Sequence, residues 1–266
     1  MIKVIAEIGW NHCGDMNLAK KFIKAASKSG ADFAKFQTWS TSRLKSGDWD
    51  NDGRREIYNN AELSEEDHLN LIDCCNQNNI LFLSSVFSIS DAELLIKIGC
   101  KEVKIPSFES RNIDLIKFCD KNFETIILST GTSSLEEIKK SVSYIASAKL
   151  FLMHCVSVYP QKYSESNLPR MKRLMDITQN VGLSDHIQGV ESSKIAIGEG
   201  AVIIEKHFTI DRELPGRDNK FSILPNQLKD LTEYIKNRDL MFKDWGDNYL
   251  EKEQDTRINY TGRFNG

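Results

Sequence analysis

Two histidines follow strand-like apolar stretches at matching positions. His186 ends GLSDH and His207 lies in IEKHFT, 207 − 186 = 21 residues later, in a chain with only five histidines. If these stretches are neighbouring strands, the two imidazoles lie side by side and can share one divalent cation. Two nitrogen ligands with open positions are typical of a catalytic metal. The spacing also allows the simpler interpretation that each imidazole caps its own strand by bonding backbone carbonyls.

Other polar residues also fall in or just after apolar runs. Lys35 and Lys104 are accompanied by strand-end serines, and such donors bind phosphate or carboxylate well. A buried, unpaired charge is costly, so these groups must pair with one another or with a ligand. An internal ion pair explains any one of them, whereas a polar pocket explains the set. The set is Glu7, Lys35, Gln37, Lys104, Ser107, Glu109, His154, Tyr159, Ser184, Asp185, His186, Glu205, Lys206 and His207, and Ser85 is a further strand-end serine near the two lysines.

The elements that position these residues alternate between short apolar runs and helix-length segments. Eight strands are expected, at 4–9, 31–39, 80–87, 100–107, 124–130, 149–156, 181–185 and 201–208. Ser64 and Ser133-Ser134 are typical helix starts, and Gly30, Gly99 and Gly200 are typical helix ends. Eight such units predict an α/β fold, a (β/α)₈ TIM barrel, with its site at the carboxyl ends of the strands. A doubly wound open sheet is the alternative, but no GxGxxG follows the first strand.

Length and composition predict one domain with a small-molecule ligand. The 266 residues suit a barrel over residues 1–243, followed by a linker-like tail over 244–266 without a second domain. A polar stretch over 40–63 replaces a short loop. The net charge of −3 gives no electrostatic footprint for nucleic acid or a membrane surface. Six cysteines without a CxxC pair indicate a reducing compartment, so a cytoplasmic location is expected.

Seven distinctive stretches carry a family resemblance. They are IAEIGWNHCGDMNLAKKFIKAA, GADFAKFQTW, VKIPSFES, ILSTGTSSLEEI, LMHCVSVYPQKY, GLSDHIQG and GAVIIEKHFTIDRELPGRDNKFS. In this order they closely resemble the sialic acid synthase family, which condenses phosphoenolpyruvate with the open-chain aldehyde of an N-acetylated amino sugar. The resemblance implies a product of the nonulosonic acid type, phosphate release, and a divalent metal. Manganese is the metal expected, with magnesium or cobalt as alternatives.

The resemblance also implies roles for individual positions. His186 and His207 match the family's metal ligands, and Glu109 matches a carboxylate near the reacting carbons. Glu7 matches a position that faces the sugar in the family, and the residues do not decide whether Glu7 or Glu109 transfers the proton. The positions that match phosphoenolpyruvate contacts are Lys35, Ser85, Lys104, Ser107, Ser157 and Ser184, and those that match further sugar contacts are Gln37, Tyr159 and Asp218.

The relatives usually continue through a linker into a C-terminal antifreeze-like domain. The tail over 244–266 resembles that linker alone. A homodimer is expected, and a separate antifreeze-like protein is a candidate partner. The acceptor stays open between N-acetylmannosamine and a dideoxy-diacetamido hexose, and the lack of an identifiable basic cluster favours an unphosphorylated sugar. The alternative functions are a pyruvate-type aldolase that uses Lys35 or Lys104 as a Schiff base, and a non-catalytic accessory barrel.

Overall fold

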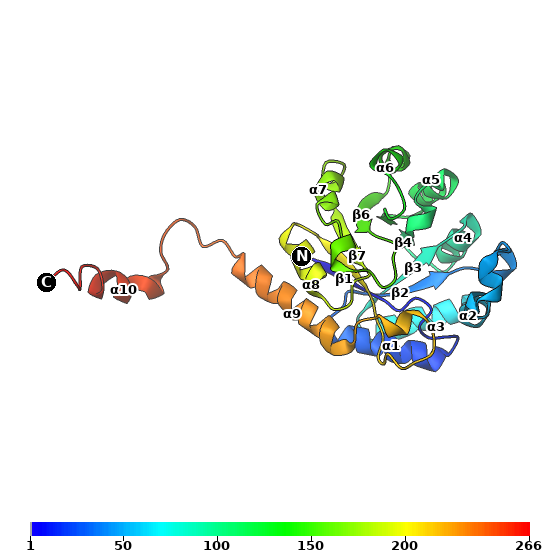
Figure 1. Ribbon diagram of the computed structural model, residues 1–266, viewed down its shortest axis with the longest axis horizontal. Coiled ribbons are helices and arrows are strands. Elements are labelled where there is room, and N and C mark those ends of the chain that lie inside the picture. The colour runs from blue at the N-terminus through cyan, green and yellow to red at the C-terminus, as the bar shows by residue number, and fades with distance from the viewer. Residues whose placement is uncertain (1) are drawn as a thin grey trace.

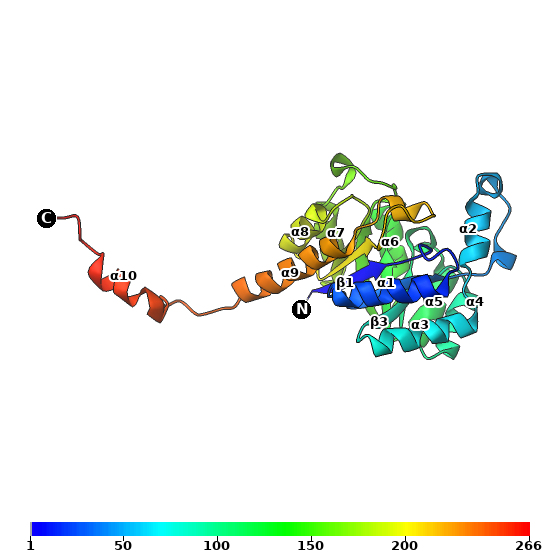
Figure 2. The same cartoon turned by 90° about the horizontal axis from the view of Figure 1, so that it is seen from below.

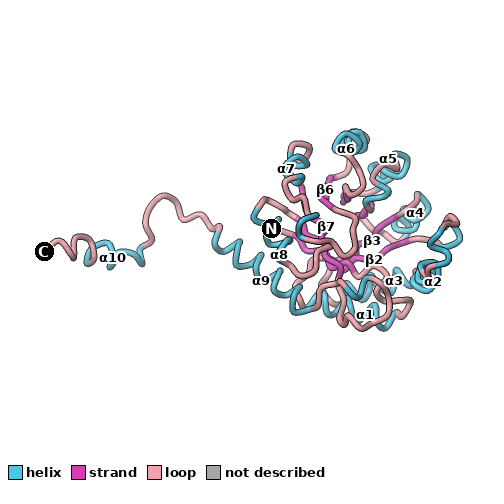
Figure 3. Tube along the Cα trace, in the orientation of Figure 1, coloured by secondary structure: helices cyan, strands magenta, loops and turns pink. Residues whose placement is uncertain are grey.

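A computed structural model describes residues 2–266, apart from the side chain of Trp49. Eight parallel strands form a closed barrel in which each strand pairs with the next along the chain and the last pairs with the first. The expected (β/α)₈ barrel is therefore confirmed, and Figures 1 and 3 show the helices surrounding the strands. The strands are β1 (Lys3–Glu7), β2 (Phe33–Thr38), β3 (Leu81–Val86), β4 (Glu102–Ile105), β5 (Thr125–Ser129), β6 (Lys149–Cys155), β7 (Val181–Asp185) and β8 (Ile203–His207).

The helices begin with the capping residues that the sequence suggests. The Ser64 side chain accepts from the Asp67 N–H at the start of α3, and Ser134 does the same for Glu137 at the start of α6. Gly30, just after α1, has a φ of 87°, a conformation that glycine adopts without strain. The helices are α1 (Met16–Lys28), α2 (Arg54–Ala61), α3 (Glu65–Gln77), α4 (Ile89–Lys97), α5 (Ile113–Asn122), α6 (Leu135–Val142), α7 (Arg170–Met175), α8 (Glu191–Gly198), α9 (Pro225–Met241) and α10 (Gln254–Asn259).

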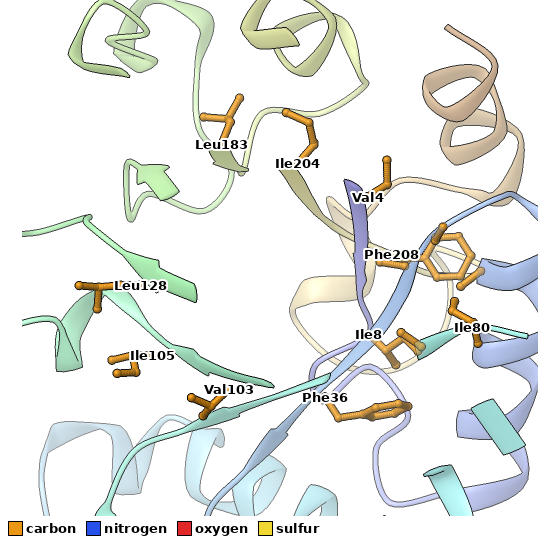
Figure 4. Packing of buried hydrophobic residues seen from close by; sticks show 14 of the residues in the cluster. Val4, Ile8, Phe36, Ile80, Val103, Ile105, Leu128, Leu183, Ile204 and Phe208 are labelled. Atoms are coloured by element: carbon orange, nitrogen blue, oxygen red, sulfur yellow. The ribbon is translucent and has the colours of Figure 1, made fainter. Parts of the chain in front are cut away.

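The apolar core has two parts. The larger lies between the strands and the surrounding helices, and Figure 4 shows Val4, Phe36 and Phe208 among its buried members. The smaller is a plug inside the barrel. It consists of Ile5, Phe33, Leu83, Ile127, Met153 and Ile203. Because strand side chains alternate between faces, the residues two positions further along these strands also point into the barrel.

Two segments depart from the regular alternation of strand and helix. The polar stretch over 40–63 contains two short 3-10 helices, η1 (Thr41–Arg43) and η2 (Asp48–Asn51), and then α2, so it is more ordered than a solvated loop. The segment after α9 extends away from the barrel and carries α10, as Figures 1 and 2 show. Within residues 2–266, no helix combines the length and the apolar character that crossing a membrane requires.

Candidate active site

A charged layer lies directly above the apolar plug. Glu7, Lys35 and Glu205 each come two positions after a plug residue, and Lys104 and Ser184 occupy the same level on β4 and β7. All five residues are buried. The sequence pattern thus places ionisable groups inside the barrel toward the carboxyl ends of its strands, where barrel enzymes keep their sites.

Glu205 connects three other members of this layer. Its two carboxylate oxygens accept hydrogen bonds from Lys104 Nζ at 2.8 and 2.7 Å, and Oε1 also accepts from Ser184 Oγ at 2.9 Å. Lys35 Nζ lies 3.7 Å from Oε2. Burial would raise the pKa of Glu205, but Lys104 and Lys35 outweigh it and hold this pKa well below its usual range. Glu205 is therefore ionised, and the two lysines keep their charges close together.

Glu7 is the second carboxylate of the layer. Its Oε2 lies 2.7 Å from Lys35 Nζ, and Gln37 Nε2 donates to its Oε1 at 2.6 Å. Burial raises the pKa of Glu7, Lys35 opposes the rise, and Glu205 adds to it. A carboxyl group whose pKa is raised is suited to proton transfer near neutral pH. Lys35 also donates to Ser85 Oγ at 2.9 Å.

The two histidines lie next to each other, with ring centroids 5.4 Å apart. His186 Nδ1 is 2.9 Å from the Val156 carbonyl oxygen. Burial would lower the pKa of His186, but Cys155 beside the ring outweighs burial and raises it. His207 Nδ1 is buried without a hydrogen-bond partner, and the nearest carboxylate oxygen, Asp218 Oδ2, is 3.6 Å away. Burial and His186 hold the pKa of His207 well below its ordinary value, so its imidazole is neutral.

Two adjacent imidazoles, one neutral and with an unsatisfied buried nitrogen, fit a divalent cation as nitrogen donors. Among residues 2–266, no group of three or more His, Cys, Asp or Glu side chains is arranged to hold a metal ion. A cation at His186 and His207 would therefore take its other ligands from water or substrate, which is the open coordination of a catalytic site.

Hydroxyl groups approach the backbone after β5. The Gly131 N–H donates to Ser107 Oγ at 3.1 Å. A side chain at Gly131 would place its Cβ 2.5 Å from Ser157 Oγ and 2.7 Å from Ser107 Oγ, so only glycine allows this approach. Ser129 Oγ is buried without a partner. Serine hydroxyls beside a backbone N–H form a neutral donor set for an anion.

These groups line one cavity of about 510 Å³, a volume in the usual range for a small-molecule site. Every substrate-binding and metal-binding residue predicted from the sequence is among its lining residues. Those residues are Lys35, Gln37, Ser85, Lys104, Ser107, Ser157, Tyr159, Ser184, His186, His207 and Asp218, and the predicted catalytic residue Glu7 lines it as well.

Glu109 is the one residue with a predicted catalytic or binding role that does not line this cavity. It lies in the 3-10 helix η3 (Ser107–Glu109), and its Oε2 accepts a hydrogen bond from Asn112 Nδ2 at 2.8 Å. The structure therefore brings Glu7, but not Glu109, together with the lysines and histidines. A catalytic role for Glu109 stays a prediction.

Three further members of the predicted polar set also lie outside the cavity lining. Lys206 pairs with Asp185 at 3.1 Å, and His154 Nε2 lies 2.7 Å from the Ser166 carbonyl oxygen.

The cavity also contains residues without a predicted role in binding or catalysis. Ser129 lies two positions after the plug residue Ile127, so the two-residue period of its strand would have identified it. Glu205 belongs to the predicted polar set, but without a specific role. Five aromatic or charged residues of the lining also have no predicted role. Trp10 and Phe87 lie in loops, Arg54 and Tyr58 lie in α2, and Phe108 lies in η3. Asp218, which the sequence did identify, is brought near His207 by the segment that follows β8. Burial and Glu7 raise the pKa of Asp218 to about 6.

A closed (β/α)₈ barrel with buried lysines and paired histidines at its carboxyl end is the architecture of a barrel enzyme that handles an anionic substrate. The family model of the NeuB family matches residues 22–246. The chain belongs to the NeuB family, which confirms the resemblance to sialic acid synthases.

Individual relatives agree with this assignment. The chain is 38% identical over 252 residues to the N,N'-diacetyllegionaminic acid synthase of Legionella pneumophila, covering 88% of this chain and 71% of that protein. It is 36% identical over 249 residues to the pseudaminic acid synthase of Helicobacter pylori, covering 88% and 73%. The crystal structure of the N-acetylneuraminic acid synthetase of Leptospira borgpetersenii superposes with a TM-score of 0.87 at 32% identity, covering 99% of this chain and 92% of that one.

Proposed function

We propose that this chain condenses phosphoenolpyruvate with the aldehyde form of an N-acetylated amino sugar, giving a nonulosonic acid and phosphate. One observation carries the proposal above all. Two buried lysines and a pair of histidines line the same cavity. The names of the relatives supply the reaction class, since legionaminic, pseudaminic and N-acetylneuraminic acids are all nonulosonic acids.

Phosphoenolpyruvate is placed over the lysines in this proposal. Lys35 and Lys104 compensate the charges of its phosphate and carboxylate, while Ser107 and Ser129 donate to the remaining oxygens. The aldehyde lies on the side of His186 and His207. Holding both substrates in one cavity removes much of the entropic barrier to their reaction.

The bonds change as follows. Carbon 3 of phosphoenolpyruvate forms a bond to the aldehyde carbon, whose oxygen gains a proton. Water then adds at carbon 2, and the resulting tetrahedral intermediate loses phosphate as the bond between carbon 2 and the phosphate oxygen breaks. Glu7 is the carboxyl group placed to give or accept these protons, because it lies in the cavity and its pKa is raised by burial.

A divalent cation, manganese with magnesium or cobalt as alternatives, belongs to the proposal and would act as a Lewis acid on the aldehyde oxygen. His186 and His207 would hold it, and the geometry described above supports that assignment. Four further proposals follow from the sequence and the family resemblance. They are a cytoplasmic location, a homodimer, an antifreeze-like partner protein, and the division into a barrel over 1–243 and a tail over 244–266.

A Schiff-base aldolase is not favoured, because its lysine must lose its proton to attack a carbonyl. Lys104 donates to both oxygens of Glu205, and Lys35 lies 2.7 Å from Glu7 Oε2, so both amines are already engaged by carboxylates. A non-catalytic barrel would not need these paired charges at the cavity floor.

Incubation with an N-acetylated amino sugar and either phosphoenolpyruvate or pyruvate distinguishes these functions. The proposal predicts a nonulosonic acid, detected by mass spectrometry, from phosphoenolpyruvate alone, and no protein adduct after borohydride treatment. A product formed from pyruvate, together with a trapped lysine adduct, would establish the aldolase. If neither donor gives a product, the non-catalytic accessory barrel is the remaining function.

A further inference from the structure

An aromatic arc borders the cavity. It consists of Trp10 after β1, Trp39 after β2, Tyr58 in α2, Phe87 after β3 and Phe108 in η3. Consecutive rings touch along the arc. Trp10 and Tyr58 have centroids 5.1 Å apart, Tyr58 and Trp39 are 5.3 Å apart, Trp39 and Phe87 are 5.9 Å apart, and Phe87 and Phe108 are 5.6 Å apart. All except Trp39 line the cavity.

Phe108 is the exposed end of this arc. One face of its ring stacks on Phe87 with an interplanar angle of 23°, and 60% of the residue is exposed. An aromatic ring that stays exposed at the border of a polar cavity favours contact with an apolar group of the ligand. Phosphoenolpyruvate has no such group beyond its methylene carbon.

A polar donor accompanies the apolar surface. The Tyr58 hydroxyl makes no hydrogen bond to any group that the structure describes, although the backbone carbonyl of the same residue accepts one from Trp39 Nε1 at 3.2 Å. Burial raises the pKa of Tyr58, so its hydroxyl stays protonated and can donate. Aromatic surface beside a free hydroxyl matches an acetamido group, which has one methyl and one carbonyl.

The charged groups near the arc do not offer a strong phosphate site. Arg54 also lines the cavity, but its guanidinium is paired with Asp52, 2.7 Å away. Arg217 and Lys220 are exposed, and Asp218, between them in sequence, places a carboxyl group in the same cavity. Exposed cations with acidic neighbours bind a phosphate weakly because water screens them.

We propose that the aromatic arc binds methyl-bearing substituents of the acceptor, and that the acceptor is therefore a deoxy hexose with two acetamido groups rather than N-acetylmannosamine. This inference rests on the proposed function and specifies its substrate class. The proposed acceptor is a diacetamido-trideoxy hexose. It carries two methyl groups at positions where N-acetylmannosamine carries hydroxyl-bearing groups. Transfer of two methyl groups from water to aromatic surface corresponds to a preference of roughly 15-fold.

Phe108 tests this inference because truncating an exposed ring leaves the barrel core intact. The experiment measures kcat/KM for the diacetamido-trideoxy hexose, N-acetylmannosamine and N-acetylmannosamine 6-phosphate at saturating phosphoenolpyruvate. Calorimetry measures the affinity of each sugar independently of turnover. We expect the wild-type protein to prefer the diacetamido sugar on the order of 10-fold. In Phe108→Ala, kcat/KM for the diacetamido sugar should fall close to that for N-acetylmannosamine, because the KM for the diacetamido sugar rises. The KM for phosphoenolpyruvate should not change.

Two further variants serve as controls. Phe108→Leu keeps apolar surface and should retain part of the preference, and Phe264→Ala, at a residue that is 91% exposed in the C-terminal segment, should retain all of it. Equal or better use of N-acetylmannosamine or its phosphate by the wild-type protein would overturn the inference. An unchanged ratio in Phe108→Ala would also overturn it. If no sugar releases phosphate, the proposed function fails, and the calorimetric preference still decides the role of the arc.

Discussion

Glu205 binds Lys104 through both carboxylate oxygens, at 2.8 and 2.7 Å, inside the barrel. Lys35 lies 3.7 Å from the same carboxylate. With Glu7, these residues form a buried layer of two carboxylates and two ammonium groups, in which every charge has an opposite neighbour. The layer can therefore exist without substrate, and the same two lysines are available when an anion enters the cavity.

Replacing Glu205 by glutamine should destabilise the fold, because two buried lysines would then share the single charge of Glu7. Removing one partner of a buried ion pair costs about 3 kcal/mol or more, and the free energy of unfolding in urea should fall by that amount. Phosphoenolpyruvate should recover part of the loss, since its charges compensate the lysines. The pair of Lys101 and Glu124 is exposed on both sides at 3.1 Å, so Glu124→Gln should change stability by less than about 0.5 kcal/mol. Equal effects of the two substitutions would contradict the role given to Glu205.

Gly131→Ala should weaken phosphoenolpyruvate binding by on the order of 10-fold or more. The added Cβ would lie 2.5 Å from Ser157 Oγ and 2.7 Å from Ser107 Oγ, so the hydroxyls or the backbone must move, at a cost of about 1–3 kcal/mol. Calorimetric titration with phosphoenolpyruvate measures the loss. Gly198, at the end of α8, has no atom within 4 Å of its added Cβ, and Gly198→Ala should leave binding unchanged. Normal affinity in Gly131→Ala would show that the substrate does not use this approach.

His12 should make stability depend on pH below neutrality. Its pKa falls from 6.5 to about 4 because the ring is buried, and Nδ1 accepts a hydrogen bond from the Gly14 N–H at 3.2 Å. Between pH 6.5 and 4, His12 therefore binds a proton in the unfolded chain but not in the folded chain. The free energy of unfolding falls as the pH falls through this window. The contribution is about 3 kcal/mol. His12→Asn should reduce the difference in unfolding free energy between pH 7 and pH 4 by this order, and an identical pH profile would refute the assignment.

How much of this site was predictable depends on where each residue lies. Lys35, Lys104, His186 and His207 lie in or at the end of apolar strands, and the barrel geometry brings strand ends together, so sequence and fold class were enough to place them. The strand pattern also identifies Glu205 as a strand-end charge, but its role as the partner of both lysines depends on side-chain directions that only the closed barrel defines.

The residues outside the strands could not be placed in this way. Tyr58 and Phe108 reach the cavity through α2 and η3, and the polar composition of 40–63 gave no sign that this stretch folds against Trp10 and Trp39. Glu109 shows the opposite case. The family resemblance gave it a catalytic role, yet a turn of 3-10 helix pairs its carboxylate with Asn112 outside the cavity lining.

His207→Ala should abolish tight manganese binding, because only His186 would remain as a nitrogen ligand. Electron paramagnetic resonance of free Mn²⁺ measures binding without any turnover, and we expect a loss of affinity on the order of 100-fold or more. His68→Gln is the matched control, because His68 is buried between Thr38 and the Ser64 carbonyl, away from the cavity. Unchanged binding in His207→Ala would remove this histidine from the metal site.

The central claim is that this cavity joins phosphoenolpyruvate to an amino sugar. The most direct measurement is phosphate release with phosphoenolpyruvate, manganese and an N-acetylated amino sugar, compared with reactions that omit one substrate. We predict one phosphate for each nonulosonic acid formed, and none without the sugar. Phosphate release that does not depend on the sugar, or no release with any amino sugar offered, would contradict the proposed function.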